Sequence, residues 1–130
     1  MLVATWNVNS IRSRIDLVKE WLLANKVDIL CLQETKTEDQ FFPVEVFSKL
    51  GYEVSISGQK SYNGVSIISK LPINDIKIGF DQVIPDYKDS SSLSQQKRII
   101  SANINDIRII NVYVPNGSSL NSDKFIYKEK

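Results

Sequence analysis

The chain has 130 residues, a length that suits one domain and is too short for two. Apolar residues make up 42% and charged residues 24%, which excludes a disordered chain, and a net charge of +1 gives no general electrostatic reason to expect a polyanion partner. No apolar run is long enough to span a bilayer, and the first residues lack a basic leader, so we expect neither a membrane segment nor a signal peptide.

The first predicted unit is strand, helix, strand. Residues 2–8 have the pattern of a strand, and Asn9-Ser10 then supplies a helix N-cap. The helix face consists of apolar residues at i, i+4, i+7 and i+11, which are Ile11, Ile15, Val18 and Leu22. Residues 27–32 form a second strand, apolar enough to be buried on both faces. Such a crossover makes the two strands parallel, so their carboxyl ends reach the same edge of the sheet.

The one cysteine, Cys31, lies inside this second strand, which predicts a buried and reduced thiol and a cytoplasmic protein. The sequence contains no histidine. Within these residues, that excludes Ser-His-Asp and Cys-His catalysis and histidine ligands to a metal.

Further elements follow along the chain. Residues 41–50 are helical or irregular up to Gly51, and strands are predicted at residues 52–57, 64–69 and 73–80. Residues 81–97 are polar and have the composition of a long mobile loop. Residues 98–104 and 107–114 are predicted to form a hairpin that turns at Asn105-Asp106. Residues 121–130 begin as an amphipathic helix, so we expect the sequence to stop within a helix.

Two polar residues follow the two parallel strands. Glu34 comes directly after the apolar strand, and Asn7 stands near the end of the first strand, so we expect them to be neighbours. A carboxylate and an amide oxygen suit Mg²⁺, which prefers oxygen ligands and keeps several waters. Each residue alone has an ordinary explanation: Glu34 as a surface glutamate, Asn7 as a turn residue. Their pairing favours the cation site.

Four other residues are weaker candidates. Tyr113 precedes the end of the last strand, where its hydroxyl would either complete the rim of the core or donate to a phosphate or a metal-bound water. Lys36 and Arg98 are candidates for phosphate contacts, although single basic residues are usually solvated. Asn116, followed by glycine, is otherwise typical of a turn.

Taken together, these segments resemble the N-terminal half of the exodeoxyribonuclease III and apurinic/apyrimidinic (AP) endonuclease family, within the endonuclease/exonuclease/phosphatase superfamily. The matching segments occur in the family's order and are residues 5–12, 28–36, 50–52, 58–60, 62–66, 97–100 and 111–117. Gln-Glu-Thr-Lys at 33–36 and Tyr-Val-Pro-Asn-Gly at 113–117 favour the DNA-repair branch over the sphingomyelinase and inositol-phosphatase branches.

The resemblance implies an α/β fold, specifically a portion of a four-layer α/β sandwich with mixed sheets. It also implies Mg²⁺- or Mn²⁺-dependent hydrolysis of double-stranded DNA at abasic sites and 3′ ends, by a protein that is monomeric when complete. Residue by residue, it implies metal ligands Glu34 and Asn7, a catalytic Tyr113, and DNA contacts by Lys36, Arg98 and Asn116.

The sequence departs from the family in what it lacks. The family's second half carries a Gly-Asp-x-Asn segment, a further Asp and a Ser-Asp-His segment, and none of these occurs here. We therefore expect residues 1–130 to be the N-terminal part of a single domain and to be inactive alone. Two alternatives stay open: a non-catalytic remnant that binds DNA or a partner, and another phosphodiesterase or phosphatase of the same superfamily.

Overall fold

A computed structural model describes residues 1–83 and 97–114 of the chain. The strands are β1 (Val3–Asn7), β2 (Ile29–Gln33), β3 (Glu53–Ser57), β4 (Val65–Ser69), β5 (Asn74–Ile78), β6 (Ile99–Ile104) and β7 (Ile107–Val112). The helices are α1 (Ile15–Asn25), the 3₁₀ turn η1 (Asp39–Phe41), α2 (Val44–Lys49) and α3 (Phe80–Val83). None of the helices in this part of the chain is long and apolar enough to cross a membrane.

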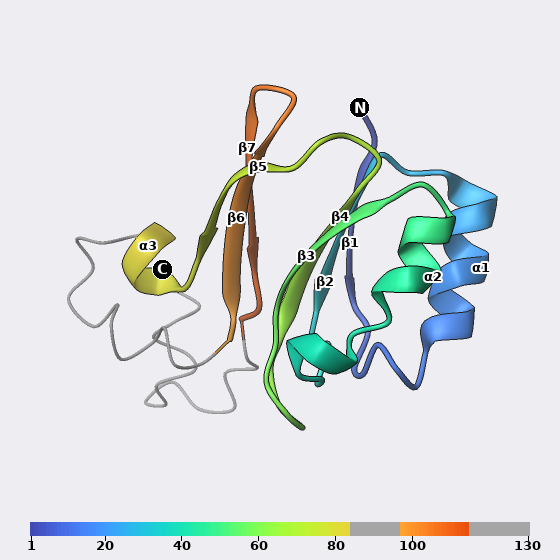
Figure 1. The fold of residues 1–130 in the computed structure, drawn as a ribbon, viewed down its shortest axis with the longest axis horizontal. Helices are drawn as coiled ribbons and strands as arrows, with labels where there is room; N and C mark the ends of the chain where they lie inside the picture. The colour runs from blue at the N-terminus through green and yellow to red at the C-terminus, as the bar shows by residue number, and fades with distance from the viewer. Residues whose placement is uncertain (84–96, 115–130) are drawn as a thin grey trace.

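The strands form two sheets that pack face to face. The first has the order β1-β2-β4-β3, with β1 parallel to β2 and the other pairs antiparallel, and the second has the antiparallel order β5-β6-β7. In Figure 1, α1 and α2 cover the outer face of the first sheet, and the second sheet lies against the opposite face. The predicted α/β sandwich and the parallel β1–β2 pair are therefore confirmed.

Strand β2 lies at the centre of this arrangement and is buried on both faces, as its apolar run predicts. Leu30 and Leu32 belong to the core between the sheet and the helices, where Val18 and Leu22 of α1 also lie. Ile29 and Cys31 point the other way, into a second core between the two sheets. Cys31 is only 6% exposed, which confirms the buried thiol.

The first helix begins later than predicted. Residues 11–14 form a turn, and α1 starts at Ile15 with no side-chain cap. Ser10 Oγ accepts a hydrogen bond from the Ser13 amide at 3.3 Å, so Ser10 caps the turn rather than the helix. The physical reason is that the amides of Ser10 and Ile11 are bonded to the loop after β2, at 2.8 Å and 3.1 Å, which holds this segment in a non-helical path.

The later elements are shorter than expected. The strand predicted at residues 73–80 is β5, which ends at Ile78, and Phe80 begins α3 instead. All five residues of β5 are exposed. The predicted loop is helical at its start, and residues 84–96 lie outside the described part of the chain, as does the helix expected at 121–130.

The predicted hairpin is present. Strands β6 and β7 pair in register from Ile99–Val112 to Ile104–Ile107, and the turn residues Asn105 and Asp106 have φ angles of 51° and 66°. Two consecutive positive φ angles match a type I′ turn, for which Asn and Asp are well suited. The hairpin turn lies at one end of the sandwich, and the loops after β1 and β2 lie at the other (Figure 1).

Candidate active site

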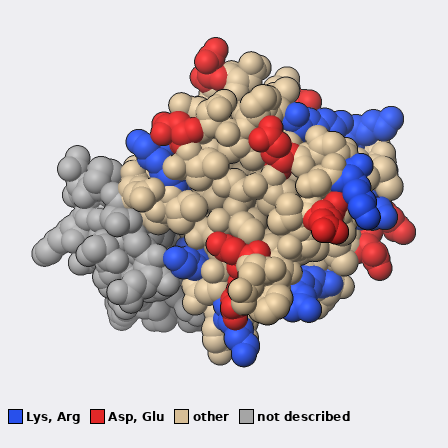
Figure 2. Space-filling model, viewed as in Figure 1, with Lys and Arg blue, Asp and Glu red and all other residues tan. Residues whose placement is uncertain are grey.

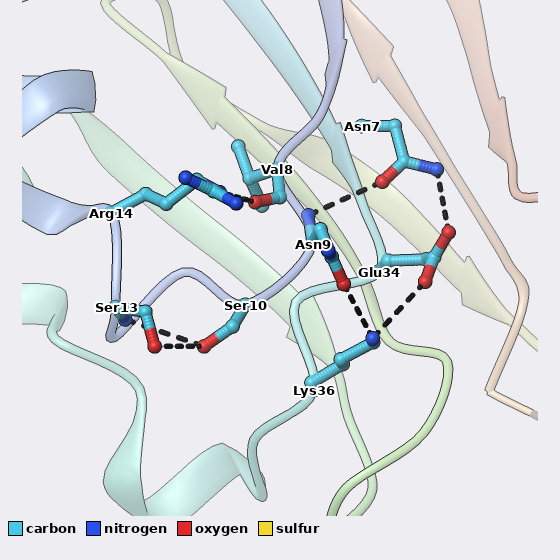
Figure 3. A network of polar contacts seen from close by, with 8 residues as sticks. All are labelled: Asn7, Val8, Asn9, Ser10, Ser13, Arg14, Glu34 and Lys36. Atoms are coloured by element: carbon cyan, nitrogen blue, oxygen red, sulfur yellow. Dashed lines mark hydrogen bonds and ion pairs between the residues drawn. The ribbon is translucent and has the colours of Figure 1, made fainter.

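The predicted neighbours meet at the carboxyl ends of β1 and β2. Asn7 is the last residue of β1 and pairs in register with Gln33, so Glu34 follows directly beside it. The Asn7 side-chain Nδ2 donates a hydrogen bond to Glu34 Oε1 at 2.8 Å, and Figure 3 shows the two side chains facing each other. The expected juxtaposition of these residues is confirmed.

The turn that carries Glu34 has an unusual backbone. Glu34 and Lys36 have φ angles of 54° and 55°, a left-handed conformation that is uncommon outside glycine. Hydrogen bonds hold this turn from both sides. They run from Ser10 N to Glu34 O (2.8 Å), Ile11 N to Thr35 O (3.1 Å), Thr35 N to Gly64 O (3.2 Å) and Lys36 N to Asn63 O (2.9 Å). The surrounding loops thus determine where the Glu34 carboxylate lies.

Gly64 allows one of these loops to come close. Its φ is +96°, and a Cβ built at this position would lie 2.1 Å from Thr35 Oγ1. Thr35 is itself only 1% exposed and cannot move toward solvent. A side chain at position 64 would therefore push the Glu34 turn away from the start of β4.

The Glu34 carboxylate is partly exposed and remains ionised at neutral pH. Burial raises the Glu34 pKa. The hydrogen bond from Asn7 and the positive charge of Lys36 lower it and together outweigh the effect of burial, so the pKa lies below its usual value. Lys36 Nζ lies 3.5 Å from Glu34 Oε2 and also donates a hydrogen bond to Asn9 Oδ1. Lys36 thus has two partners on the chain itself (Figure 3).

Tyr113 reaches the same carboxylate from the second sheet. Its hydroxyl lies close enough to the Glu34 carboxylate for each group to shift the pKa of the other, and its ring is half-buried just beyond the end of β7. Burial raises the Tyr113 pKa, and the nearby Glu34 carboxylate raises it further, while the Arg98 charge opposes them. At neutral pH, Tyr113 is therefore a protonated donor next to an ionised acceptor.

Arg98 lies behind this pair rather than on the surface. Its side chain is 1% exposed, and its carbonyl accepts the Tyr113 amide hydrogen bond at 2.7 Å. In this structure the Arg98 carbonyl supports the Tyr113 backbone, and the Arg98 positive charge lowers the Tyr113 pKa. Asn116, which is also expected to contact DNA, lies outside the described residues.

Sequence reasoning missed three polar residues of this region. The sequence pattern predicts Asn9 as part of a helix cap. In the structure, its side-chain Oδ1 accepts a hydrogen bond from Lys36, and its backbone N–H donates one to Asn7 Oδ1 at 3.2 Å. Gln33 and Asn111 share a hydrogen bond of 2.8 Å between the two sheets. A signal for Asn111 was available, since a single amide interrupts the apolar run of residues 109–112.

The oxygen atoms of this cluster are suitable ligands for one side of a Mg²⁺ ion. Glu34 offers an ionised carboxylate, and the side-chain oxygens of Asn7 and Asn9, which accept hydrogen bonds from the Asn9 backbone and from Lys36, lie at the same edge. Mg²⁺ is typically held by one or two carboxylates together with waters and substrate phosphate. Within residues 1–83 and 97–114, no three His, Cys, Asp or Glu side chains gather to form a fuller site. On the face shown in Figure 2, acidic and basic groups alternate without a single-sign patch.

Comparison with known proteins shows which families and structures the chain is similar to. Residues 4–97 match the profile of the Endonuclease/Exonuclease/phosphatase family. Among curated proteins, exodeoxyribonuclease III of Haemophilus influenzae is 34% identical over 135 aligned residues, which cover 100% of this chain and 48% of that protein. The chain therefore spans half or less of the length of the curated relatives it matches, 48% of this one and 37% of the DNA repair nuclease APEX1 of Danio rerio.

Two solved structures share the fold over the same half. An AP endonuclease from Archaeoglobus fulgidus has a TM-score of 0.82 and 45% identity, covering 98% of this chain and 47% of that one. A 3′ phosphatase from Neisseria bound to a product DNA hairpin has a TM-score of 0.83 and 41% identity, covering 99% and 47%.

Proposed function

Because the chain belongs to the endonuclease/exonuclease/phosphatase family, we propose that it forms the Glu34-bearing half of a divalent-metal-dependent nuclease active site. The reaction would be phosphodiester hydrolysis in double-stranded DNA, at abasic sites and at 3′ ends. The protein would act in the cytoplasm as a monomer once its catalytic site is complete.

The observation that carries this proposal is the meeting of three side chains from two sheets. Glu34, Asn7 and Tyr113 come from the ends of β2, β1 and β7; Asn7 donates a hydrogen bond to the Glu34 carboxylate, and Tyr113 is close enough to that carboxylate to shift its pKa. Residues from three strands converge on one ionised carboxylate. An isolated surface glutamate would not have this arrangement of partners.

The roles of the residues follow from their donors and acceptors. Glu34, with oxygen support from Asn7, would hold Mg²⁺ or Mn²⁺, and the bound cation would neutralise charge that develops on the phosphate. Tyr113, a protonated hydroxyl, would donate a hydrogen bond to a phosphate oxygen. Lys36 would keep the carboxylate ionised and is exposed enough to reach a phosphate. Arg98 would act through Tyr113, and Asn116 stays a predicted DNA contact.

The choice of DNA as partner rests on the relatives and on the surface beside the site. One relative was solved with a product DNA hairpin, and others carry AP endonuclease or exonuclease names. Next to Asn63, whose carbonyl accepts the Lys36 amide, Tyr62 is 70% exposed. An exposed ring beside a phosphate site is suited to contact with a nucleotide.

The chain alone supplies only part of the chemistry. It has no histidine and lacks the Asp-x-Asn and Ser-Asp-His segments of the family. We therefore propose that residues 1–130 bind a divalent cation weakly and do not turn over. This follows because the groups that would position the attacking water are absent from these residues.

The test joins this chain to a second half. The 130-residue chain, and a chimera of its residues 1–114 with the C-terminal half of the Haemophilus influenzae relative, are assayed with Mg²⁺ on abasic duplex DNA and on inositol phosphates. We expect no cleavage by the chain, cleavage of abasic DNA by the chimera, and loss of at least about 100-fold in the chimera on Glu34→Gln.

Glu45→Gln is the matched control, because Glu45 is an exposed carboxylate on α2, outside the site. It should leave the chimera's activity unchanged. Turnover by the isolated chain at a rate near that of full-length relatives would refute the half-site. Hydrolysis of inositol phosphates without DNA cleavage would transfer the chain to another branch of the family.

A further inference from the structure

A buried amide joins the two sheets directly behind the site. Asn111 of β7 is 2% exposed, and its Nδ2 donates to the carbonyls of Leu32 (2.9 Å) and Ser66 (2.8 Å). Its Oδ1 accepts from Gln33 Nε2 at 2.8 Å. Both donor positions of the amide and its acceptor are thus used, at the edge of the apolar core between the two sheets.

The two carbonyls belong to facing residues of neighbouring strands. Leu32 of β2 and Ser66 of β4 are partners in the antiparallel register, so one side chain of the second sheet holds two strands of the first. Gln33 extends the link, because its Nε2 also donates to Thr5 Oγ1 of β1 at 2.8 Å. Asn111 therefore connects β7 with β2 and β4 directly and with β1 through Gln33.

The position of this link along each strand relates it to the site. Asn111 stands two residues before Tyr113, so in the alternating pattern of a strand both side chains face the first sheet. On the other side, Leu32 and Gln33 directly precede Glu34. A shift at the Asn111 contact would be passed to Tyr113 and Glu34 over one or two residues of backbone.

We propose that Asn111 is a positioning residue, whose amide fixes β7 against β2 and β4 and so sets where the Tyr113 hydroxyl meets the Glu34 carboxylate. As far as it concerns catalysis, this inference rests on the proposed nuclease function. A hydrophobic side chain of similar size would fill the same space, but it would leave the register between the two sheets less defined.

The experiment uses the 130-residue chain and four variants. Asn111→Leu removes the amide and keeps the branching and number of side-chain heavy atoms, Gln33→Met removes its partner, and the double variant completes a cycle. Ile104→Val is the control, because Ile104 lies in the same inter-sheet core but at the hairpin end of β6. Two properties are measured by NMR: the Tyr113 ring and Glu34 carboxyl shifts without metal, and the Mg²⁺ dissociation constant.

We expect Asn111→Leu and Gln33→Met to move the Tyr113 and Glu34 signals and to raise the Mg²⁺ dissociation constant about 10-fold, the usual effect of losing an outer partner of a metal ligand. The double variant should add little to the larger single effect. Ile104→Val should lower stability and leave both measurements unchanged.

The outcomes separate this inference from the proposed function. If Ile104→Val changes the NMR shifts and the Mg²⁺ dissociation constant as much as Asn111→Leu does, Asn111 is an ordinary core residue. If Gln33→Met leaves the Tyr113 and Glu34 shifts unchanged, the inference is overturned, even if Asn111→Leu fails to fold. If the unaltered chain binds no Mg²⁺, the proposed function fails, while the metal-free signals still decide whether Asn111 positions Tyr113.

Discussion

Glu34 occupies a backbone conformation that an L-residue adopts at a cost of about 1–2 kcal/mol. Four backbone hydrogen bonds to neighbouring loops offset this cost and leave the carboxylate with little freedom to move. Strained residues of this kind cluster at binding sites, where their position matters more than local stability. The site therefore depends on small neighbours that let the loops approach, above all on Gly64.

We predict that Gly64→Ala destabilises the chain by about 2–4 kcal/mol, because the new Cβ would combine the cost of a positive φ with a 2.1 Å clash against Thr35 Oγ1. Gly51→Ala is the control, since Gly51 has φ +88° but no atom within 4 Å of its added Cβ. It should cost only about 1 kcal/mol. Urea denaturation measures both, and equal costs would show that the Thr35 contact carries no weight.

At this scale, residue chemistry was partly readable from the sequence. Glu34 and Asn7 could be paired because parallel strands deliver their ends to one edge. The approach of Tyr113 could not be derived, since it depends on how the second sheet packs on the first. The burial of Arg98 was likewise hidden, because a single arginine before a strand is usually at the surface.

Among the elements, the β6–β7 hairpin is the one that its turn residues specify most directly. Both central residues have positive φ, and the turn lies at the end of the sandwich away from Glu34 (Figure 1). The start of α1 shows the opposite case. There a good capping sequence was overridden by tertiary hydrogen bonds to the loop after β2, which no local pattern reveals.

We predict that Asp106→Gly stabilises the chain by about 0.5–1 kcal/mol, because glycine adopts the φ of 66° without strain in a type I′ turn. Asp106→Ala, which keeps the strain and loses the polar side chain, should destabilise it by a similar amount. Thermal unfolding followed by circular dichroism compares the two. A lower melting temperature for Asp106→Gly would contradict the assignment of the turn.

Over the whole molecule, the fold is two sheets whose shared core contains the one thiol of the chain. Burial raises the Cys31 pKa from 9.0 to about 11. Below pH 9 both folded and unfolded chains hold the thiol proton, so Cys31 gives no pH dependence there. As pH rises from 9 to 11, the unfolded chain releases the proton first, and stability falls.

We predict a loss of about 2–3 kcal/mol from this group by pH 11, relative to pH 8. Cys31→Ala removes the group, so the stability difference between the two proteins should shrink as pH rises across this range. Other groups that titrate there, such as tyrosines, affect both proteins and cancel. A constant difference would mean that the thiol ionises as easily in the folded chain as in the unfolded one.

The general architecture was predictable because the apolar runs and the crossover are local signals, and the sandwich followed from the family resemblance. What the chain does alone was not predictable from pattern, since it covers only about half of its relatives. The reason is physical, because an active site assembled from many strands can be predicted only for those strands that the sequence contains.

The interlocked turn at Glu34 also bears on how the molecule folds. Its hydrogen bonds join residues 8–11, 33–36 and 63–64, and its carboxylate meets Tyr113 at the far end of the described chain. Closing such distant loops is slow compared with forming a helix or a hairpin. The Glu34 site should consequently form among the last events of refolding. A fluorescence or NMR signal from Tyr113 would therefore report only on fully folded molecules.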